Sequence, residues 1–73
     1  MGIKKVKRAI GARVKDERRR RGLKQEELAE ISGVSTKTII QIENFKGNPT
    51  IKTIDKLAKT FKMKLEELLC DSE

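Results

Sequence analysis

The chain has 73 residues, 40% of them charged, so it forms one domain at most. Phe45 and Phe61 are its only aromatic residues, which argues against single-strand or RNA binding by base stacking. A lone cysteine, Cys70, and the lack of histidine exclude an internal disulfide framework and a zinc site.

The net charge of +7 is unevenly distributed along the chain. The first 24 residues carry eleven Lys or Arg and two acidic residues, a balance of +9; the other 49 carry seven basic and nine acidic residues, a balance of −2. This asymmetry favours a polyanionic partner. The alternative is a solvated basic helix that only aids solubility.

The first predicted helix covers about residues 4–20. Its apolar residues Ile3, Val6, Ile10 and Val14 recur at helical spacing, and Gly22 is the expected left-handed stop. Residues 1–8 form a basic N-terminal arm or an extension of this helix. The apolar stripe is narrow, so we expect no membrane partner, and no run of residues can span a bilayer or act as a secretory signal. A cytoplasmic protein is expected.

Residues 25–44, QEELAEISGVSTKTIIQIEN, carry the most information. A short helix over 25–31 offers Leu28, Ala29 and Ile31 to a core, Gly33 supplies a turn, and Ser35 caps a helix over 36–44. Val34, Ile39 and Ile42 form the next apolar set, spaced for a helix. This pattern predicts a helix-turn-helix, whose second helix usually enters the major groove of DNA.

A loop with Gly47, Asn48 and Pro49 follows, and Thr50 caps a fourth helix over about 51–61. The inward residues of this helix are expected to be Ile54, Leu57, Ala58 and Phe61. A fifth helix covers about 65–69. The sequence therefore predicts an all-α, five-helix domain over residues 1–73.

The side of the third helix opposite Ile39 and Ile42 presents Thr36, Lys37, Ile40, Gln41 and Asn44. Gln can pair with adenine, Lys can donate to guanine, and Thr or Ile methyl groups can touch the thymine methyl. The acid of this helix, Glu43, falls beside the buried stripe and is interpreted as structural.

Phosphate contacts are expected where helices begin, because free N–H groups and the helix dipole favour anions there. Gln25 and Ser35 occupy such positions, and Asn44, Lys46 and Asn48 follow the third helix. The alternative for each polar residue is simple exposure to solvent.

Residues 10–69 resemble the phage repressor and Cro (XRE-type) helix-turn-helix family. The matching segments are IGARVKDERRRRGLKQEELA, GVSTKTIIQIEN and NPTIKTIDKLAKTF…LEELL. The resemblance implies base contacts from the third helix, phosphate contacts, and an ion pair between the first and third helices. The residues implied are Thr36, Lys37 and Gln41 for bases, Gln25, Ser35, Asn44 and Lys46 for phosphates, and Arg18 with Glu43 for the ion pair.

The chain departs from this family at several positions. Phe45 replaces the usual Gly after the third helix, so either Asn44 supplies the left-handed residue or Phe45 packs on the core or a partner. Lys62 and Lys64 replace the usual Gly and Ser or Thr before the last helix, which weakens its start. Ile40 is unusually apolar for an exposed position, and we expect it to contact a thymine methyl.

These features predict a sequence-specific regulator of transcription that binds double-stranded DNA as a homodimer on a palindromic operator. Met63, Leu65 and Leu69 are the expected dimer contacts; alternatively they only close the monomer core. The second hypothesis is an antitoxin that also represses its own promoter. Enzyme activity is not expected, because the chain lacks histidine, a convergent carboxylate pair and a Gly-rich phosphate loop. No cofactor, metal or small-molecule substrate is expected.

Overall fold

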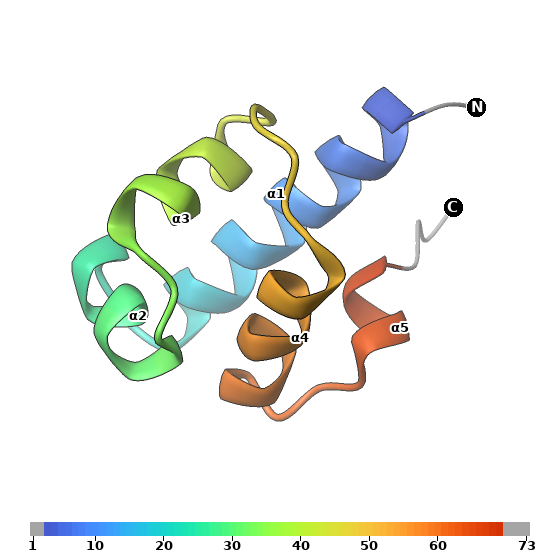
Figure 1. The fold of residues 1–73 in the computed structure, drawn as a ribbon. Helices are drawn as coiled ribbons and strands as arrows, with labels where there is room; N and C mark the ends of the chain where they lie inside the picture. The colour runs from blue at the N-terminus through green and yellow to red at the C-terminus, as the bar shows by residue number, and fades with distance from the viewer. Residues whose placement is uncertain (1–2, 70–73) are drawn as a thin grey trace.

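Five helices make up the computed structural model, which describes the backbone of residues 3–69 and the side chains of residues 10–68. They are α1 (Ile3–Arg20), α2 (Gln25–Ser32), α3 (Thr36–Glu43), α4 (Ile51–Thr60) and α5 (Leu65–Leu69) (Figure 1). The described residues contain no strand. The predicted all-α, five-helix class is confirmed, with helix ends within one or two residues of those expected.

The long helix α1 crosses the molecule and packs against α3 on one side and α5 on the other (Figure 1). Helix α2 packs against α3 and α4, and α4 packs against α5. The core between them is aliphatic apart from Phe61. Its buried members are Ile10, Val14, Leu28, Val34, Ile39, Ile42, Ile54, Leu57, Ala58, Phe61 and Leu68.

One residue predicted to lie in the core does not lie there. Ile31 is 59% exposed, whereas Leu28 is fully buried and Ala29 is half-buried. The inward side of α2 follows positions 25, 28, 29 and 32, the i, i+3, i+4, i+7 stripe of a helix. Ile31 lies on the flank of Leu28 that is opposite Ala29, so Val34 beyond the turn takes the next core position.

Helix starts show how the chain compensates for poor capping residues. Ser35 and Thr50 cap α3 and α4, each accepting a hydrogen bond at 3.1 Å from the N–H three residues later, as expected. Lys24 precedes α2 without a side-chain cap, but its backbone N–H donates to the Glu27 carboxylate at 2.8 Å. Lys64 does the same before α5, donating to Glu67 at 2.8 Å. At both helix starts, the hydrogen bond from the backbone N–H to the Glu side chain, one of the two bonds of a capping box, therefore replaces the missing Ser or Thr cap.

Three helices end in the same way, with a left-handed residue after the last turn. This residue is Gly22 after α1 (φ 66°), Phe45 after α3 (φ 61°) and Lys62 after α4 (φ 59°). In each case the following N–H bonds back to the helix, as Lys46 N–H does to the Gln41 carbonyl at 2.7 Å, which completes a Schellman motif. Gly33 ends α2 with the simpler single bond, to the Ala29 carbonyl at 3.0 Å.

Of the two alternatives left open at the end of α3, the one in which Asn44 supplies the left-handed residue is wrong, and Phe45 instead packs its ring against α1. Asn44 completes the last turn of α3 with φ −95°, and the motif places the left-handed backbone one residue later. Phe45 accepts this conformation while its ring lies over Gly11 of α1. A Cβ atom at Gly11 would come within 2.8 Å of Phe45 Cδ1, so glycine is what allows the ring to sit there.

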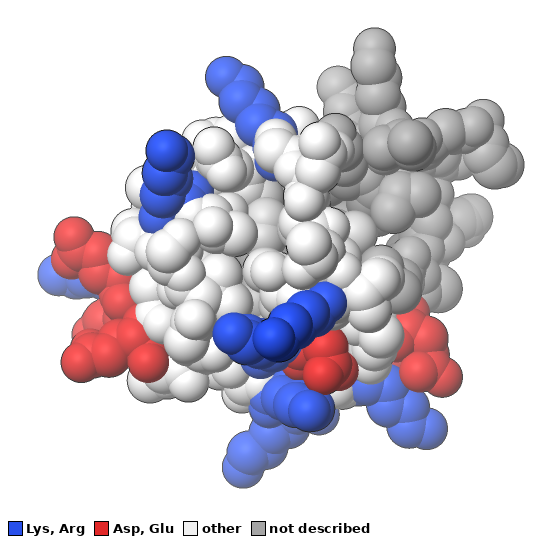
Figure 2. Space-filling model, viewed as in Figure 1, with Lys and Arg blue, Asp and Glu red and all other residues white. Residues whose placement is uncertain are grey.

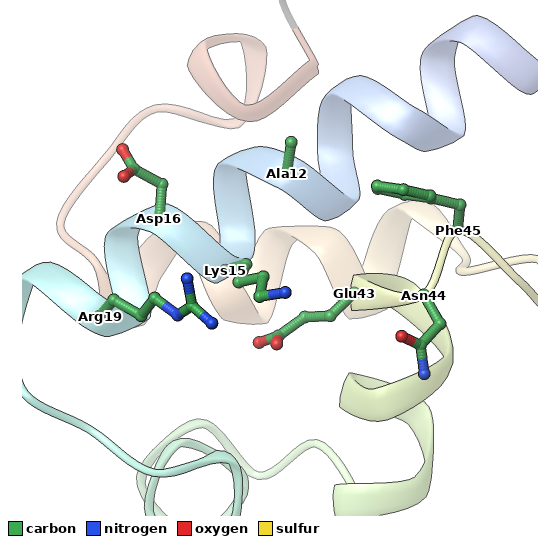
Figure 3. Close-up of a pocket in the computed structure, with 7 residues that line it drawn as sticks. All are labelled: Ala12, Lys15, Asp16, Arg19, Glu43, Asn44 and Phe45. Carbon is green, nitrogen blue, oxygen red and sulfur yellow. The ribbon is translucent and has the colours of Figure 1, made fainter.

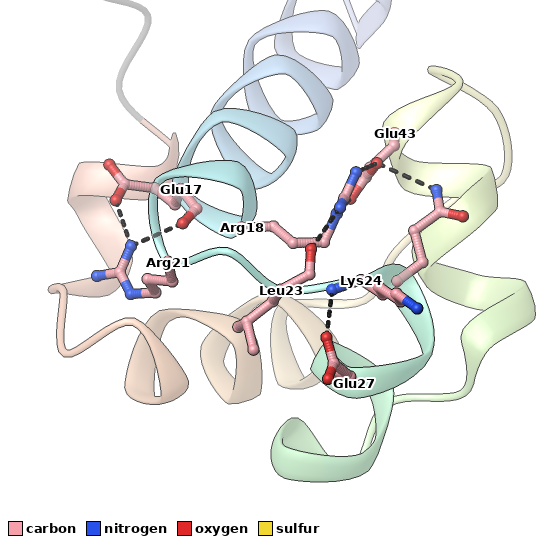
Figure 4. Close-up of polar contacts among 8 residues, drawn as sticks. Glu17, Arg18, Arg21, Leu23, Lys24, Glu27 and Glu43 are labelled. Atoms are coloured by element: carbon pink, nitrogen blue, oxygen red, sulfur yellow. Dashed lines mark hydrogen bonds and ion pairs between the residues drawn. The ribbon is translucent and has the colours of Figure 1, made fainter.

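Arg21 joins the end of α1 to the end of α4. Its guanidinium donates to the Phe61 carbonyl at 2.8 Å and lies 4.7 Å from the centre of the Phe61 ring. The same group donates to Glu17 Oε1 at 2.6 Å, which satisfies a nearly buried carboxylate. Figure 4 shows the contact between Arg21 and Glu17.

The basic segment over residues 3–8 belongs to α1, so it extends the first helix rather than forming an extended arm. The side chains of Ile3, Val6 and Leu69, and all of Cys70, lie outside the described residues. Among the helices that the structure describes, none combines the length and the apolar character needed to cross a membrane.

Candidate nucleic-acid interface

Helix α3 has one buried side and one outward side. Ile39 and Ile42 anchor it in the core, between 0% and 3% exposed. The outward side carries Lys37, Ile40, Gln41 and Asn44, all exposed, and the half-buried Thr36. Ile40 is 38% exposed, so it is a surface residue rather than a core residue. The outward side therefore combines hydrogen-bonding groups, one cation and one apolar side chain, with no carboxylate.

Gln41 lies against the loop that follows α3. Its Oε1 atom is 3.2 Å from the position that a Cβ atom would take on Gly47, whose φ is 74°. A larger residue at position 47 would push against the glutamine amide. The loop backbone therefore limits where the Gln41 side chain can point.

The hydroxyl of Ser35 is already engaged in the start of α3. It accepts from Thr38 N–H at 3.1 Å and donates to Thr38 Oγ1 at 2.8 Å. An anion at this end of α3 would meet the other free N–H groups of the first turn, which are the usual donors at a helix N-terminus.

One carboxylate ties three helices together. Glu43 on α3 accepts two hydrogen bonds from Arg18 on α1, at 2.7 Å from Nε and 3.0 Å from Nη2 (Figure 4). It accepts a third from the Gln25 amide on α2, at 3.1 Å. The third nitrogen of the Arg18 guanidinium, Nη1, donates to the Leu23 carbonyl at 2.7 Å. The ion pair implied by the family resemblance is thus a network that also contains Gln25.

The network is strongly shielded from water. The Glu43 side chain is 2% exposed and that of Arg18 is 11% exposed. The hydrogen bond to Glu43, more than its negative charge, raises the pKa of Arg18, against the opposing effect of burial. A raised arginine pKa keeps the guanidinium charged, so its contribution to folding is lost only as the pH rises through that value.

Gln25 has fewer donors available for a phosphate than expected. One N–H of its amide is used by Glu43, so a phosphate at this helix start would meet the other N–H or the backbone N–H groups of α2. No local pattern indicates the contact between Gln25 and Glu43, because the two residues are 18 positions apart.

A search among known protein families shows that the helix-turn-helix model HTH_3 matches residues 14–68. The chain belongs to this helix-turn-helix family. The match covers all of α2 to α4 and confirms the resemblance to the phage repressor and Cro proteins.

Several helix-turn-helix regulators are similar to the chain. It is 37% identical over 65 residues to the HTH-type transcriptional regulator PuuR of Escherichia coli, covering 89% of this chain and 35% of PuuR. It is 37% identical over 64 residues to the cryptic phage CTXphi transcriptional repressor RstR of Vibrio cholerae, covering 88% of this chain and 58% of RstR. An HTH-type transcriptional regulator of Archaeoglobus fulgidus is 38% identical over 61 residues, 84% of this chain and 86% of the relative. The chain thus spans about a third of PuuR and most of the archaeal protein.

Two solved structures share the fold. An HTH_3 family transcriptional regulator from Vibrio cholerae superposes with a TM-score of 0.80 at 32% identity, over 86% of this chain and 35% of that one. The hypothetical transcription factor NHTF from Neisseria superposes with a TM-score of 0.85 over 92% of this chain and 77% of that one. The second likeness, at 22% identity, shows the fold alone.

The two helices of the helix-turn-helix differ in surface charge. Figure 2 shows acidic side chains gathered over α2, basic side chains over α3 and the loop after it, and both signs mixed along α4 and α5, with a mostly uncharged area between them. The acids of α2 are the exposed Glu26, Glu27 and Glu30, and the cations of α3 and its loop are Lys37 and Lys46. The outward side of α3 is therefore on the positive part of the helix-turn-helix.

A pocket that was not predicted lies where α1 crosses the end of α3. It is lined from α1 by Ala12, Lys15, Asp16 and Arg19 and from the end of α3 by Glu43, Asn44 and Phe45 (Figure 3). The spacing of Lys15 and Arg19, four residues apart on one helix, could have pointed to a shared face. Their position beside α3 required the fold.

The expected dimer residues lie near the other end of the molecule. Met63 and Leu65 are half-buried and pack against the core cluster, so part of their apolar surface stays accessible.

Proposed function

We propose that this chain binds double-stranded DNA in a sequence-specific manner and regulates transcription, with α3 in the major groove. The observation that carries the proposal is the outward side of α3, where a carboxylate-free set of donors, acceptors and methyl groups stands on a helix anchored by Ile39 and Ile42. The family and the names of its relatives, among them a transcriptional repressor, support the same function.

Base recognition is assigned to Thr36, Lys37, Ile40 and Gln41. The Gln41 amide offers an acceptor and donors that match the edge of adenine, and Lys37 offers donors for guanine. The methyl groups of Thr36 and Ile40 supply apolar contacts for thymine.

Phosphate contacts are assigned to residues at both ends of α3 and at the start of α2. Ser35 and Gln25 begin their helices, and Asn44 and Lys46 are exposed at and after the end of α3. Such contacts fix the position of the protein on the duplex and carry no sequence information directly.

The chain acts as a homodimer on a palindromic operator in this proposal. The contact uses the exposed parts of Met63 and Leu65, together with Leu69, at the end formed by α4 and α5. Two α3 helices would then read half-sites about 34–36 Å apart. A small domain also gains stability from burying this apolar surface.

The test is a binding-site selection on random duplex DNA, followed by affinity measurements on the recovered site. Gln41→Ala is expected to relax the preference at one position of each half-site, by about 1–3 kcal/mol of discrimination. Lys46→Ala is expected to weaken binding to all duplexes similarly and to reduce the salt slope by about one. Recovery of no preferred duplex, or wild-type affinity and preference in both variants, would overturn the proposed docking.

A further inference from the structure

We infer that the pocket between α1 and the end of α3 binds a backbone phosphate of the DNA through Lys15 and Arg19. This inference rests on the proposed function and adds α1 to the surface that grips the duplex. It assigns a role to two of the cations that make the first part of the chain so basic.

The pocket has a volume of about 430 Å³ and is formed by two elements far apart in sequence. Figure 3 shows the Lys15 and Arg19 side chains directed from α1 toward the end of α3, where the Glu43 carboxylate lies; the Asn44 amide points away from α1 and the Phe45 ring extends toward Ala12. The two cations offer charge-assisted donors to the acceptor oxygens of a phosphate, in a pocket whose lining also includes the Asp16 and Glu43 carboxylates.

The two carboxylates that line the pocket, Asp16 and Glu43, already have partners. Asp16 lies 3.5 Å from Arg20, and in Figure 3 its carboxylate points away from Lys15 and Arg19. Glu43 is held by Arg18 and Gln25. Among the described residues Lys15 and Arg19 form no ion pair, so their charges remain available to an external anion.

The pocket continues the outward side of α3. Positions 36, 40 and 44 form one row along that side, and Asn44 also lines the pocket. A helix about 10–12 Å wide fills a major groove about 12 Å wide, so the backbone strands that border the groove run close to the elements that flank the helix. The anion that lies there is a phosphate of the bound duplex.

The experiment compares the double variant Lys15→Gln/Arg19→Gln with wild type on the duplex recovered by selection, from 50 to 400 mM KCl. The matched control Lys56→Gln/Lys64→Gln removes the same charge from exposed positions on α4 and before α5. The pocket variant is expected to lower the slope of log K against log salt by about two, and the affinity at 0.1 M salt by a factor of roughly 60. The control is expected to change the slope by less than one, because distant charges are screened.

Sequence preference separates this inference from the proposed function. The pocket variant is expected to select the same duplex as wild type, because phosphate contacts do not read bases. A wild-type protein with no duplex binding would overturn the proposed function and the inference together. Specific binding with equal slopes in pocket and control variants would overturn the inference alone. The inference would also be overturned if NMR showed saturable binding of inorganic phosphate to the pocket while the salt slope of DNA binding did not depend on Lys15 and Arg19.

Discussion

The buried network around Glu43 makes a sharp prediction about stability. Glu43→Ala removes a carboxylate that is 2% exposed and that accepts two hydrogen bonds from Arg18 and one from Gln25. The Arg18 guanidinium, itself 11% exposed, would keep only the Leu23 carbonyl as a partner. Leaving a shielded charge uncompensated in this way costs about 3–5 kcal/mol.

This loss is large compared with the total stability of such a small domain. At about 0.05–0.15 kcal/mol per residue, a chain of 73 residues has an unfolding free energy of roughly 4–11 kcal/mol. The variant is therefore expected to be close to unfolded at 25 °C or to melt more than about 12 °C below wild type.

Urea titration followed by circular dichroism at 222 nm measures this loss directly, since the chain has no Trp or Tyr for a fluorescence assay. Glu66→Ala is the matched control, because Glu66 is exposed on α5; it is expected to change stability by less than about 0.5 kcal/mol. The double variant Arg18→Met/Glu43→Leu removes both charges and is expected to recover at least half of the loss. A cost below about 1 kcal/mol for Glu43→Ala, or a double variant as unstable as the single one, would refute the account of a desolvated pair.

Three glycine-related predictions use the same urea assay. Gly11→Ala is expected to lower stability by about 1–3 kcal/mol, because the new methyl would collide with the Ile42 carbonyl and the Phe45 ring and force α1 away from α3. Lys62→Gly is expected to raise stability by about 0.5–1 kcal/mol, because it relieves a left-handed backbone at an exposed position; an unchanged midpoint would show that this backbone is not strained. Gly22→Ala makes the opposite change in the equivalent motif and is expected to cost about 1 kcal/mol, with a gain counting against the argument.

Periodicity and capping residues were sufficient to predict the elements. The spacing of Ile10 and Val14, and of Ile54, Leu57 and Ala58, placed the inward sides of α1 and α4 as the structure has them. These signals are local, since they depend on residues three or four positions apart. The error at Ile31 shows their limit, because hydrophobicity alone did not tell which flank of Leu28 faces the core.

The error at Asn44 has a different cause. Asparagine tolerates a left-handed backbone better than phenylalanine, so the residue type favoured Asn44. The geometry of the helix end decided otherwise, because the bonds from Phe45 N–H and Lys46 N–H fix the left-handed residue at position 45. The contact with Gly11, 34 residues earlier, is then available to the ring. No local pattern carries that information.

The same distinction between local patterns and contacts distant in sequence applies to the candidate interface. The outward side of α3 was predictable, because a single helix sets which residues share a face. The Lys15 and Arg19 pocket was not, since it depends on how α1 crosses α3. Sequence patterns therefore predict which residues share an exposed face when that face lies on one helix, but not which residues come together when two distant helices build a pocket.

Glu43 also links stability to the orientation of α3. Its Oε1 atom accepts from both Arg18 and Gln25, so one side chain connects α1, α2 and α3 (Figure 4). In the proposed complex, the angle between α2 and α3 would decide how α3 enters the groove while the start of α2 meets the DNA backbone. Removing only the Gln25 amide should then leave the Arg18 pair intact while loosening that angle. Its effect would appear in DNA binding more than in unfolding free energy. Because Gln25 is also assigned a phosphate contact, a change in sequence preference, rather than an equal loss of affinity for all duplexes, would identify the orienting role.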